Sequence, residues 1–176
     1  MNDLVKIVRA LDFAARKHVG QKRKGEAGEP YVNHLAEVAL MLAEATGGRD
    51  PDLVIAGLLH DTIEDQDVKY EELAAEFGKD VADLVVEVTD DKRLPKEERK
   101  RLQVETAPGK SQRAKMLKIA DKTANLRSIR SSPPSHWNSE RKRQYFDWAA
   151  NVVAGCRGAS KPLEALFDEV HRRGPG

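Results

Sequence analysis

The chain has 176 residues, 40% hydrophobic and 34% charged, which is enough for one compact domain with an apolar core and a densely charged surface. Its 30 basic and 29 acidic residues give a net charge of +1, which argues against a general nucleic-acid binder but allows a local basic pocket. A single cysteine, Cys156, excludes a disulfide scaffold or a cysteine-based zinc site within one chain.

The N-terminal segment predicts an amphipathic helix over residues 3–19. Charged residues occur throughout this segment, whereas a signal peptide contains an uncharged apolar stretch. No stretch of the chain approaches the roughly 18 apolar residues of a membrane helix. We therefore expect a cytoplasmic protein with no membrane contact. The helix is predicted from apolar residues that recur at helical spacing: Leu4, Val8, Leu11, Ala15 and Val19.

A polar, glycine-rich loop closed by Pro30 leads to a second predicted helix over residues 31–46. Asp50 can cap a third helix, with Pro51 at its first position. This third helix contains the sequence LVIAGLL, which is apolar on every side, so we expect it to be central and buried.

Helical patterns continue to the C-terminus, separated by prolines and glycines, and no segment shows a convincing strand pattern. The chain is thus predicted to be all-α. We expect one domain over residues 1–176, a single bundle of about eight to ten helices with no significant sheet. The remaining helices are expected near 69–77, 79–89, 96–107, 111–130, 136–155 and 160–172.

The segment LLHDTIEDQD, residues 58–67, runs an apolar helix directly into one histidine and four acids. Acids at a helix C-terminus are unfavourable, and burying several is worse unless a cation compensates them. His60 and Glu64 are four residues apart, as are Asp61 and Asp65, so they would form one strip on this helix. A solvated helix end is the alternative, and a divalent metal is the simplest compensation.

Two distant residues favour the metal. His34 lies on the second predicted helix, where a lone histidine would more often be structural. Asp121 lies on an apolar face, with Asn125 and Ser128 in the same row, and an aspartate there needs a partner. Two imidazoles and two carboxylates suit one Mn²⁺ per chain, with Fe²⁺, Zn²⁺ or Co²⁺ as possibilities. The predicted ligands are His34, His60, Asp61 and Asp121.

The order H…HD…D resembles that of the HD-domain phosphohydrolases. Longer segments narrow the resemblance to the small alarmone hydrolases, which are single-domain relatives of the hydrolase half of the RelA/SpoT enzymes and include metazoan SpoT homologues. The resemblance covers nearly the whole chain. It implies an all-helical, Mn²⁺-dependent enzyme that removes the 3′-pyrophosphate from guanosine tetraphosphate or pentaphosphate, giving GDP or GTP. The matching segments are QKRKGEAGEPYVNH, LLHDTIEDQD, VTDDKRLPKEERKRLQ, KIADKTANLR and QYFDWAANVV.

The resemblance assigns roles residue by residue. The four predicted ligands match the family's metal ligands. Glu64 and Asp65 match the acidic pair beside the reacting water, so we expect Glu64 to act as acid and base and Asp65 to orient the water, although the two could share the role. Arg23 and Lys24 match a basic pair at the mouth of the site, where Arg23 can stack on a base and Lys24 can balance phosphate charge.

Five further positions match residues that contact the substrate in the family. Asn125 and Ser128 correspond to the nucleoside pocket, and Tyr145 to a tyrosine near the sugar and phosphates. Lys96 and Arg141 correspond to distal phosphate contacts. On sequence alone, Tyr145 could equally be a packed core aromatic, and the two cations could be solvated.

The chain departs from the family pattern at three positions. Leu35 stands where the family often has proline, and Thr123 and Ala124 are smaller than usual. The metal ligands are unaffected, whereas the shape of the base pocket is not fixed. Because no synthetase or regulatory region follows residue 176, we expect an enzyme that degrades the alarmone without making it.

Two other functions remain open. A phosphatase for another nucleotide, such as one acting on the ribose phosphate of NADPH, would share the metal centre and differ only in the pocket. A non-catalytic nucleotide-binding module is disfavoured because all four ligands and both acids are present. We expect a monomer or weak homodimer that binds a small nucleotide and no nucleic acid.

Overall fold

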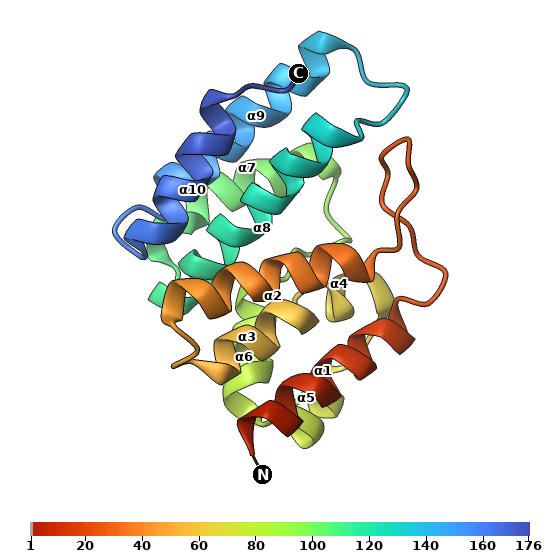
Figure 1. The fold of residues 1–176 in the computed structure, drawn as a ribbon, viewed down its shortest axis with the longest axis vertical. Coiled ribbons are helices and arrows are strands. Elements are labelled where there is room, and N and C mark those ends of the chain that lie inside the picture. The colour runs from red at the N-terminus through yellow and green to blue at the C-terminus, as the bar shows by residue number, and fades with distance from the viewer. Residues whose placement is uncertain (1) are drawn as a thin grey trace.

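The computed structural model describes residues 2–176, so Met1 of the expected domain lies outside the described residues. Within residues 2–176 the chain forms helices and turns, and its β pairing is limited to an isolated bridge between Lys22 and Pro30. The all-α prediction is confirmed (Figure 1). The elements are α1 (Asp3–Lys17), α2 (Val32–Thr46), α3 (Pro51–Leu59), α4 (Thr62–Gln66), α5 (Tyr70–Phe77), α6 (Lys79–Val88), α7 (Lys96–Thr106), the 3-10 helix η1 (Ala107–Gly109), α8 (Gln112–Ser131), α9 (Ser139–Ala154) and α10 (Lys161–Arg172).

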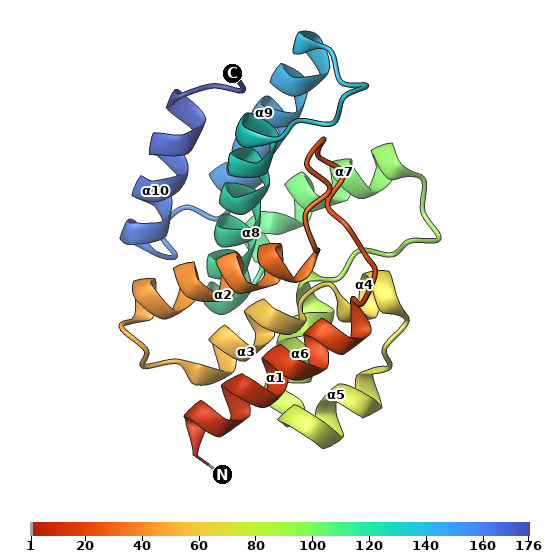
Figure 2. The same ribbon diagram turned by 45° about the vertical axis from the view of Figure 1, so that its right-hand side comes forward.

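Helix α3 is the centre of the fold, as its sequence predicts. Every residue from Leu53 to Leu59 is buried, and the helix packs against α1, α2, α6 and α8 (Figures 1 and 2). Gly57 allows α2 to approach closely, because a Cβ there would lie only 2.7 Å from Cδ1 of Leu42. This close packing brings the end of α3 near the start of α2.

Side-chain caps begin the helices that frame the site. Asp50 accepts a hydrogen bond of 3.0 Å from the N–H of Leu53 at the start of α3, which confirms the predicted cap. Ser111 and Asn138 do the same for α8 and α9, with distances of 3.2 Å and 2.8 Å to the N–H three residues on. The caps fix where each helix starts along the chain.

The prediction of one continuous helix through residues 58–67 is wrong. Helix α3 ends at Leu59, and the separate short helix α4 begins at Thr62. Nδ1 of His60 donates 2.8 Å to the carbonyl of Gly57, and the hydroxyl of Thr62 donates 2.6 Å to that of Leu59. These side chains compete for carbonyls that a continuing helix would pair with backbone N–H groups. The acids therefore do not share one helical strip with His60.

Helix α1 also differs from its predicted orientation. The residues expected to form its apolar face are exposed: Leu4 is 68% exposed, Val8 55% and Val19 82%. The buried residues are instead Ala10 and Ala14, both 0% exposed, because small side chains let α1 lie close against α3. Apolar residues cover a wide arc of α1, and the part of the arc that faces the core is the one that carries Ala10 and Ala14.

The loop of residues 18–31 joins α1 to α2 and reaches the far end of α8 (Figure 2). The N–H of Glu26 donates 3.2 Å to the carbonyl of Pro133, and the N–H of Ala27 donates 2.8 Å to the hydroxyl of Ser132. The loop is thereby held at the C-terminal end of α8. No helix within residues 2–176 is both long and apolar enough to cross a membrane.

Candidate metal and nucleotide site

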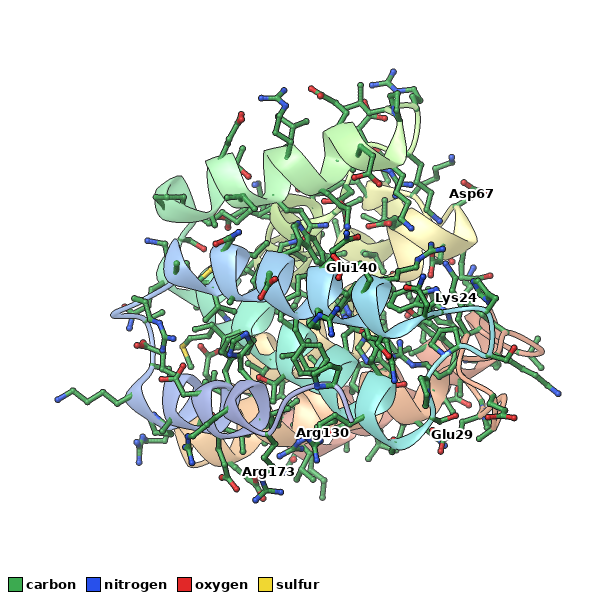
Figure 3. The ribbon with its side chains drawn as sticks, turned by 90° about the horizontal axis from the view of Figure 1, so that it is seen from above. Lys24, Glu29, Asp67, Arg130, Glu140 and Arg173 are labelled. Atoms are coloured by element: carbon green, nitrogen blue, oxygen red, sulfur yellow. The ribbon has the colours of Figure 1, made fainter. Side chains whose placement is uncertain are left out.

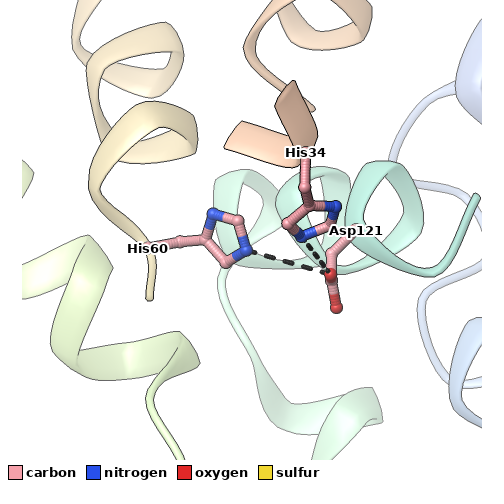
Figure 4. Close-up of side chains that lie close together, drawn as sticks. All are labelled: His34, His60 and Asp121. Atoms are coloured by element: carbon pink, nitrogen blue, oxygen red, sulfur yellow. Dashed lines mark ion pairs between the residues drawn. The ribbon is translucent and has the colours of Figure 1, made fainter. Parts of the chain in front are cut away.

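Three side chains converge where α2, α3 and α8 meet (Figure 4). His34 lies in the first turn of α2, His60 directly follows α3, and Asp121 lies midway along α8. Nε2 of His34 is 3.2 Å from Oδ1 of Asp121, and Nε2 of His60 is 3.8 Å from the same oxygen. One potential ligand atom from each residue lies within 4.8 Å of the others, so the three could hold a metal ion.

Asp61, the fourth predicted ligand, lies against the same two imidazoles. Its Oδ2 is 3.1 Å from Nε2 of His60 and 3.8 Å from Nε2 of His34. The same oxygen accepts a hydrogen bond of 2.6 Å from the hydroxyl of Tyr31. The break between α3 and α4 thus still leaves the carboxylate of Asp61 beside the cluster.

The surroundings of His60 fit a bound cation. Its Nδ1 carries a proton, because it donates to the carbonyl of Gly57, and its Nε2 is buried without a hydrogen-bond partner. Burial lowers the pKa of His60, but the charges of Asp61 and Asp121 outweigh burial and raise the pKa to about 10. The cluster therefore attracts positive charge at Nε2, which either a proton or a divalent metal can supply.

Asp121 is held from two sides. Its Oδ1, which faces the imidazoles, accepts 2.7 Å from the side-chain amide of Asn125. Its Oδ2 accepts 2.8 Å from the ammonium of Lys122, which is only 4% exposed and packs 4.7 Å from the ring centre of Trp148. Burial raises the pKa of Asp121, but the charge of Lys122 and the nearby imidazoles of His34 and His60 outweigh burial and hold the pKa well below its usual range. The group is a carboxylate.

The two acids expected to act on water have different surroundings. Oε2 of Glu64 accepts 3.2 Å from the N–H of Asp90, and Oε1 lies 3.6 Å from Nη1 of Arg99. Burial, followed by the charges of Asp61 and Asp90, raises the pKa of Glu64. A carboxyl group with a raised pKa holds a proton more readily than an ordinary glutamate, which suits it to accept and return one.

Asp65 is held by hydrogen bonds on both oxygens. Its Oδ2 accepts 3.0 Å from the side-chain amide of Gln21, and its Oδ1 accepts from the ammonium of Lys92. Both Glu64 and Asp65 line the same cavity. The structure therefore places the two acids beside one space but gives them different partners.

This cavity has a volume of about 1150 Å³ and lies beside the metal cluster. Figure 3, viewed from above, labels two residues of its wall, Lys24 from the loop of residues 18–31 and Glu140 from the first turn of α9. A smaller cavity of about 120 Å³ contains His60 and Asp121. The two share four lining residues: Tyr31, Asp61, Glu64 and Asn125. All seven substrate contacts expected from the sequence line the larger cavity: Arg23, Lys24, Lys96, Asn125, Ser128, Arg141 and Tyr145.

Aromatic rings and basic side chains alternate along the cavity. The guanidinium of Arg141 lies 4.8 Å from the ring centre of Trp137. Tyr145 lies between Trp137 and Trp148, with ring centres 5.6 Å and 5.1 Å away, so its packed and cavity-lining roles coexist. Flat surfaces beside cations suit a nucleobase with attached phosphates.

The cavity concentrates positive charge that the composition of the whole chain conceals. Burial, followed by Arg141 and Lys100, lowers the pKa of Lys96, as expected where cations crowd together. An anionic ligand would relieve this repulsion. The lining holds five acids and eight basic residues, the latter being Lys22, Arg23, Lys24, Lys92, Lys96, Arg99, Lys100 and Arg141.

Sequence reasoning missed several residues of the site. Lys122 holds Asp121 and was hidden because it lies next to that ligand in the chain. His18 follows α1 and belongs to no motif, yet it is only 3% exposed and stacks on Tyr31. The segments quoted above contained others without assigning them a role: Gln21, Tyr31, Lys92, Arg99 and Lys100.

Known proteins are similar to this chain in sequence and in fold. The family described as HD domain matches residues 10–151. The chain is 47% identical to guanosine-3′,5′-bis(diphosphate) 3′-pyrophosphohydrolase MESH1 of Xenopus tropicalis, over 96% of this chain and 94% of the relative. It is 48% identical to the human protein of the same name, over 98% of this chain and 96% of the relative.

A solved structure is also similar to this chain. It is described as a metazoan orthologue of SpoT that hydrolyses ppGpp and plays a role in starvation responses. The TM-score is 0.91 at 46% identity, over 96% of this chain and 94% of the other. The match to the family over more than half of the chain, together with these full-length relatives, shows that the chain belongs to the HD domain family.

Proposed function

We propose that this chain is a metal-dependent guanosine-3′,5′-bis(diphosphate) 3′-pyrophosphohydrolase. The observation that carries the proposal is the continuity between the cluster of His34, His60 and Asp121 and a basic cavity, through shared lining residues such as Asp61 and Glu64. A nucleotide with two separate pyrophosphates fits, because one can reach the cluster while the other meets the cations. The names of the full-length relatives support the same substrate.

We infer one divalent cation per chain, held by His34, His60, Asp61 and Asp121. Two imidazoles and two carboxylates favour Mn²⁺, with Fe²⁺, Zn²⁺ and Co²⁺ as competitors. When bound, the cation supplies Lewis acidity to a phosphoryl group and to a water molecule. Lys122 holds the outer oxygen of Asp121, which leaves Oδ1 facing the imidazoles.

The protein's own part in the reaction is proton transfer and positioning. A water oxygen forms a bond to the phosphorus that carries the 3′ oxygen, and the bond between that phosphorus and the 3′ oxygen breaks. Glu64 accepts the proton of the water and returns it to the 3′ oxygen as the bond to phosphorus breaks, which releases pyrophosphate and leaves Glu64 as a carboxylate. Asp65, held by Gln21 and Lys92, orients the water.

The remaining cavity residues would bind the substrate. We assign the nucleoside to Arg23, Asn125, Ser128 and Tyr145, and the distal pyrophosphate to Lys24, Lys96 and Arg141. The lowered pKa of Lys96 supports this assignment, because an anion among these cations offsets their mutual repulsion. The site draws on segments from the loop after α1 to α9, so we treat residues 1–176 as one catalytic domain.

A substrate panel with Mn²⁺-loaded protein tests the proposal. We expect guanosine tetraphosphate to give GDP and pyrophosphate, and Glu64→Gln to lower kcat about 10²- to 10⁴-fold while nucleotide binding persists. Preferential release of phosphate from NADPH would favour the phosphatase alternative. Binding of the nucleotide without turnover by any metal-loaded form would favour a non-catalytic module.

A further inference from the structure

A hydrogen-bonded network lies beside Asp65, and Gln21 is its hub. Oε1 of Gln21 accepts 2.7 Å from Nδ1 of His18 and also accepts from the side-chain amide of Gln66. Nε2 of Gln21 donates 3.0 Å to Oδ2 of Asp65. The start of the loop after α1 is thus joined to helix α4 beside the carboxylate of Asp65.

The orientation of the Gln21 amide is fixed by its partners. An amide oxygen can only accept, so Nδ1 of His18 must carry a proton. The ring of His18 is 3% exposed and stacks on Tyr31 with ring centres 5.1 Å apart and planes at 16°, so packing holds its plane. Because the carboxylate of Asp65 can only accept, the atom of the Gln21 amide that faces it is Nε2, which turns Oε1 toward His18 and Gln66.

The network around Gln21 is also connected to the metal cluster, through Tyr31. The backbone N–H of Tyr31 donates 2.9 Å to the carbonyl of Gln21, and the hydroxyl of Tyr31 donates to Asp61. The other oxygen of Asp65, Oδ1, accepts from the ammonium of Lys92, a side chain that is 48% exposed. An ion pair with so exposed a lysine contributes little to holding the carboxylate in one orientation. Gln21 is therefore the rigid partner of Asp65.

We propose that Gln21, oriented by His18 and Gln66, is a positioning residue that fixes the rotation of the Asp65 carboxylate for the reaction. The inference rests on the proposed function, in which Asp65 orients the reacting water. Loss of the donor at Nε2 would free the carboxylate to turn toward Lys92. Turnover would then fall, whereas substrate binding, which depends on other cavity residues, would not.

Four variants isolate this role. Gln21→Glu keeps the shape and the acceptor but offers Asp65 no donor, and Gln21→Met removes both groups. His18→Asn keeps a donor near the place of Nδ1, whereas His18→Leu has none. Glu29→Gln, in the same loop but exposed and pointing outward (Figure 3), is the matched control for exchange between carboxylate and amide.

Steady-state kinetics with guanosine tetraphosphate and saturating Mn²⁺ give the first readout. We expect kcat to fall about 10- to 100-fold in Gln21→Glu and Gln21→Met, with KM unchanged to within about 2-fold. His18→Leu should lose part of kcat, and His18→Asn should recover most of it. A kcat of Gln21→Glu equal to that of Glu29→Gln, or equal losses in the two His18 variants, would overturn the proposal.

A second readout does not depend on the substrate. With ¹⁵N-labelled histidine, the native protein should show a slowly exchanging proton on Nδ1 of His18, and this signal should shift or vanish in Gln21→Met. Its absence from the native protein would overturn the orientation of Gln21. Native protein that leaves guanosine tetraphosphate intact would instead refute the proposed function, and the variants would then be compared on the nucleotide that the panel shows to be hydrolysed.

Discussion

Arg23 donates a hydrogen bond of 2.8 Å from Nη2 to Oδ1 of Asn125, although 102 positions separate the two residues in the chain. Asn125 in turn donates 2.7 Å to Asp121. The guanidinium also lies 5.5 Å from the ring centre of Tyr31, which donates to Asp61. Two short paths thus join the cavity wall to the metal cluster, because the loop of residues 18–31 lies over α8.

Replacing Arg23 tests the first of these paths. Arg23→Lys keeps the charge but removes the planar fork that reaches Asn125. Hydrogen bonds of charged groups contribute about 1.5–3 kcal/mol, so we expect KM for guanosine tetraphosphate to rise about 10- to 100-fold. Steady-state kinetics with guanosine tetraphosphate measure this KM. Arg173→Lys, on the exposed end of α10, is the control, and identical kinetics for the two variants would contradict the prediction.

The acidic limb of the pH profile should depend on Asp90. Burial, then the charges of Asp61 and Asp90, raise the pKa of Glu64, so the base gains its proton at a higher pH than an ordinary glutamate. Asp90→Asn removes one of these charges and lowers the pKa of Glu64. The acidic limb of kcat/KM should therefore move to lower pH. The exposed Asp67→Asn should leave it in place (Figure 3), and a shift to higher pH in Asp90→Asn would refute the assignment of Glu64.

Metal binding should stabilise the folded chain. Mn²⁺ at 100 times its Kd should raise the free energy of unfolding by about 2.7 kcal/mol, or the Tm by roughly 5–10 °C. Asp121→Asn should lose this gain, because the amide removes an anionic ligand beside both imidazoles. Glu29→Gln should keep it. Thermal unfolding with chelator and with added Mn²⁺ measures both, and a full gain in Asp121→Asn would exclude Asp121 as a ligand.

Replacing glycine by alanine should have opposite effects on stability at two positions, Gly155 and Gly109. A Cβ at Gly155 would lie 2.8 Å from Cβ of Ala107 and 2.9 Å from Cδ of Pro108, so Gly155→Ala should cost about 1–3 kcal/mol. A Cβ at Gly109 would meet nothing within 4 Å, so Gly109→Ala should be neutral or stabilise by up to about 1 kcal/mol. Denaturant unfolding of both variants measures the difference. Equal midpoints would show that Gly155 does not lie against Ala107 and Pro108 as closely as these distances indicate.

The sequence by itself determined the helices and the chemistry that they carry. The helical spacing, the Asp50 cap and the apolar run of Leu53–Leu59 are local properties, and local hydrogen bonding and hydrophobicity are enough to express them. The resemblance to a family then named the ligands and the cavity residues. What it supplied was a set of residue types, with no statement of how they contact one another.

Only the tertiary structure decided which surfaces and partners are used. The apolar arc of α1 is compatible with two buried faces, and the fit of Ala10 and Ala14 against α3 selected one of them. The break after Leu59 depends on side chains that compete for carbonyls at the end of a packed helix. Asn125 lies 102 positions from Arg23, and Asp65 44 positions from Gln21. Contacts at such separations arise from packing, which periodicity along the chain does not encode.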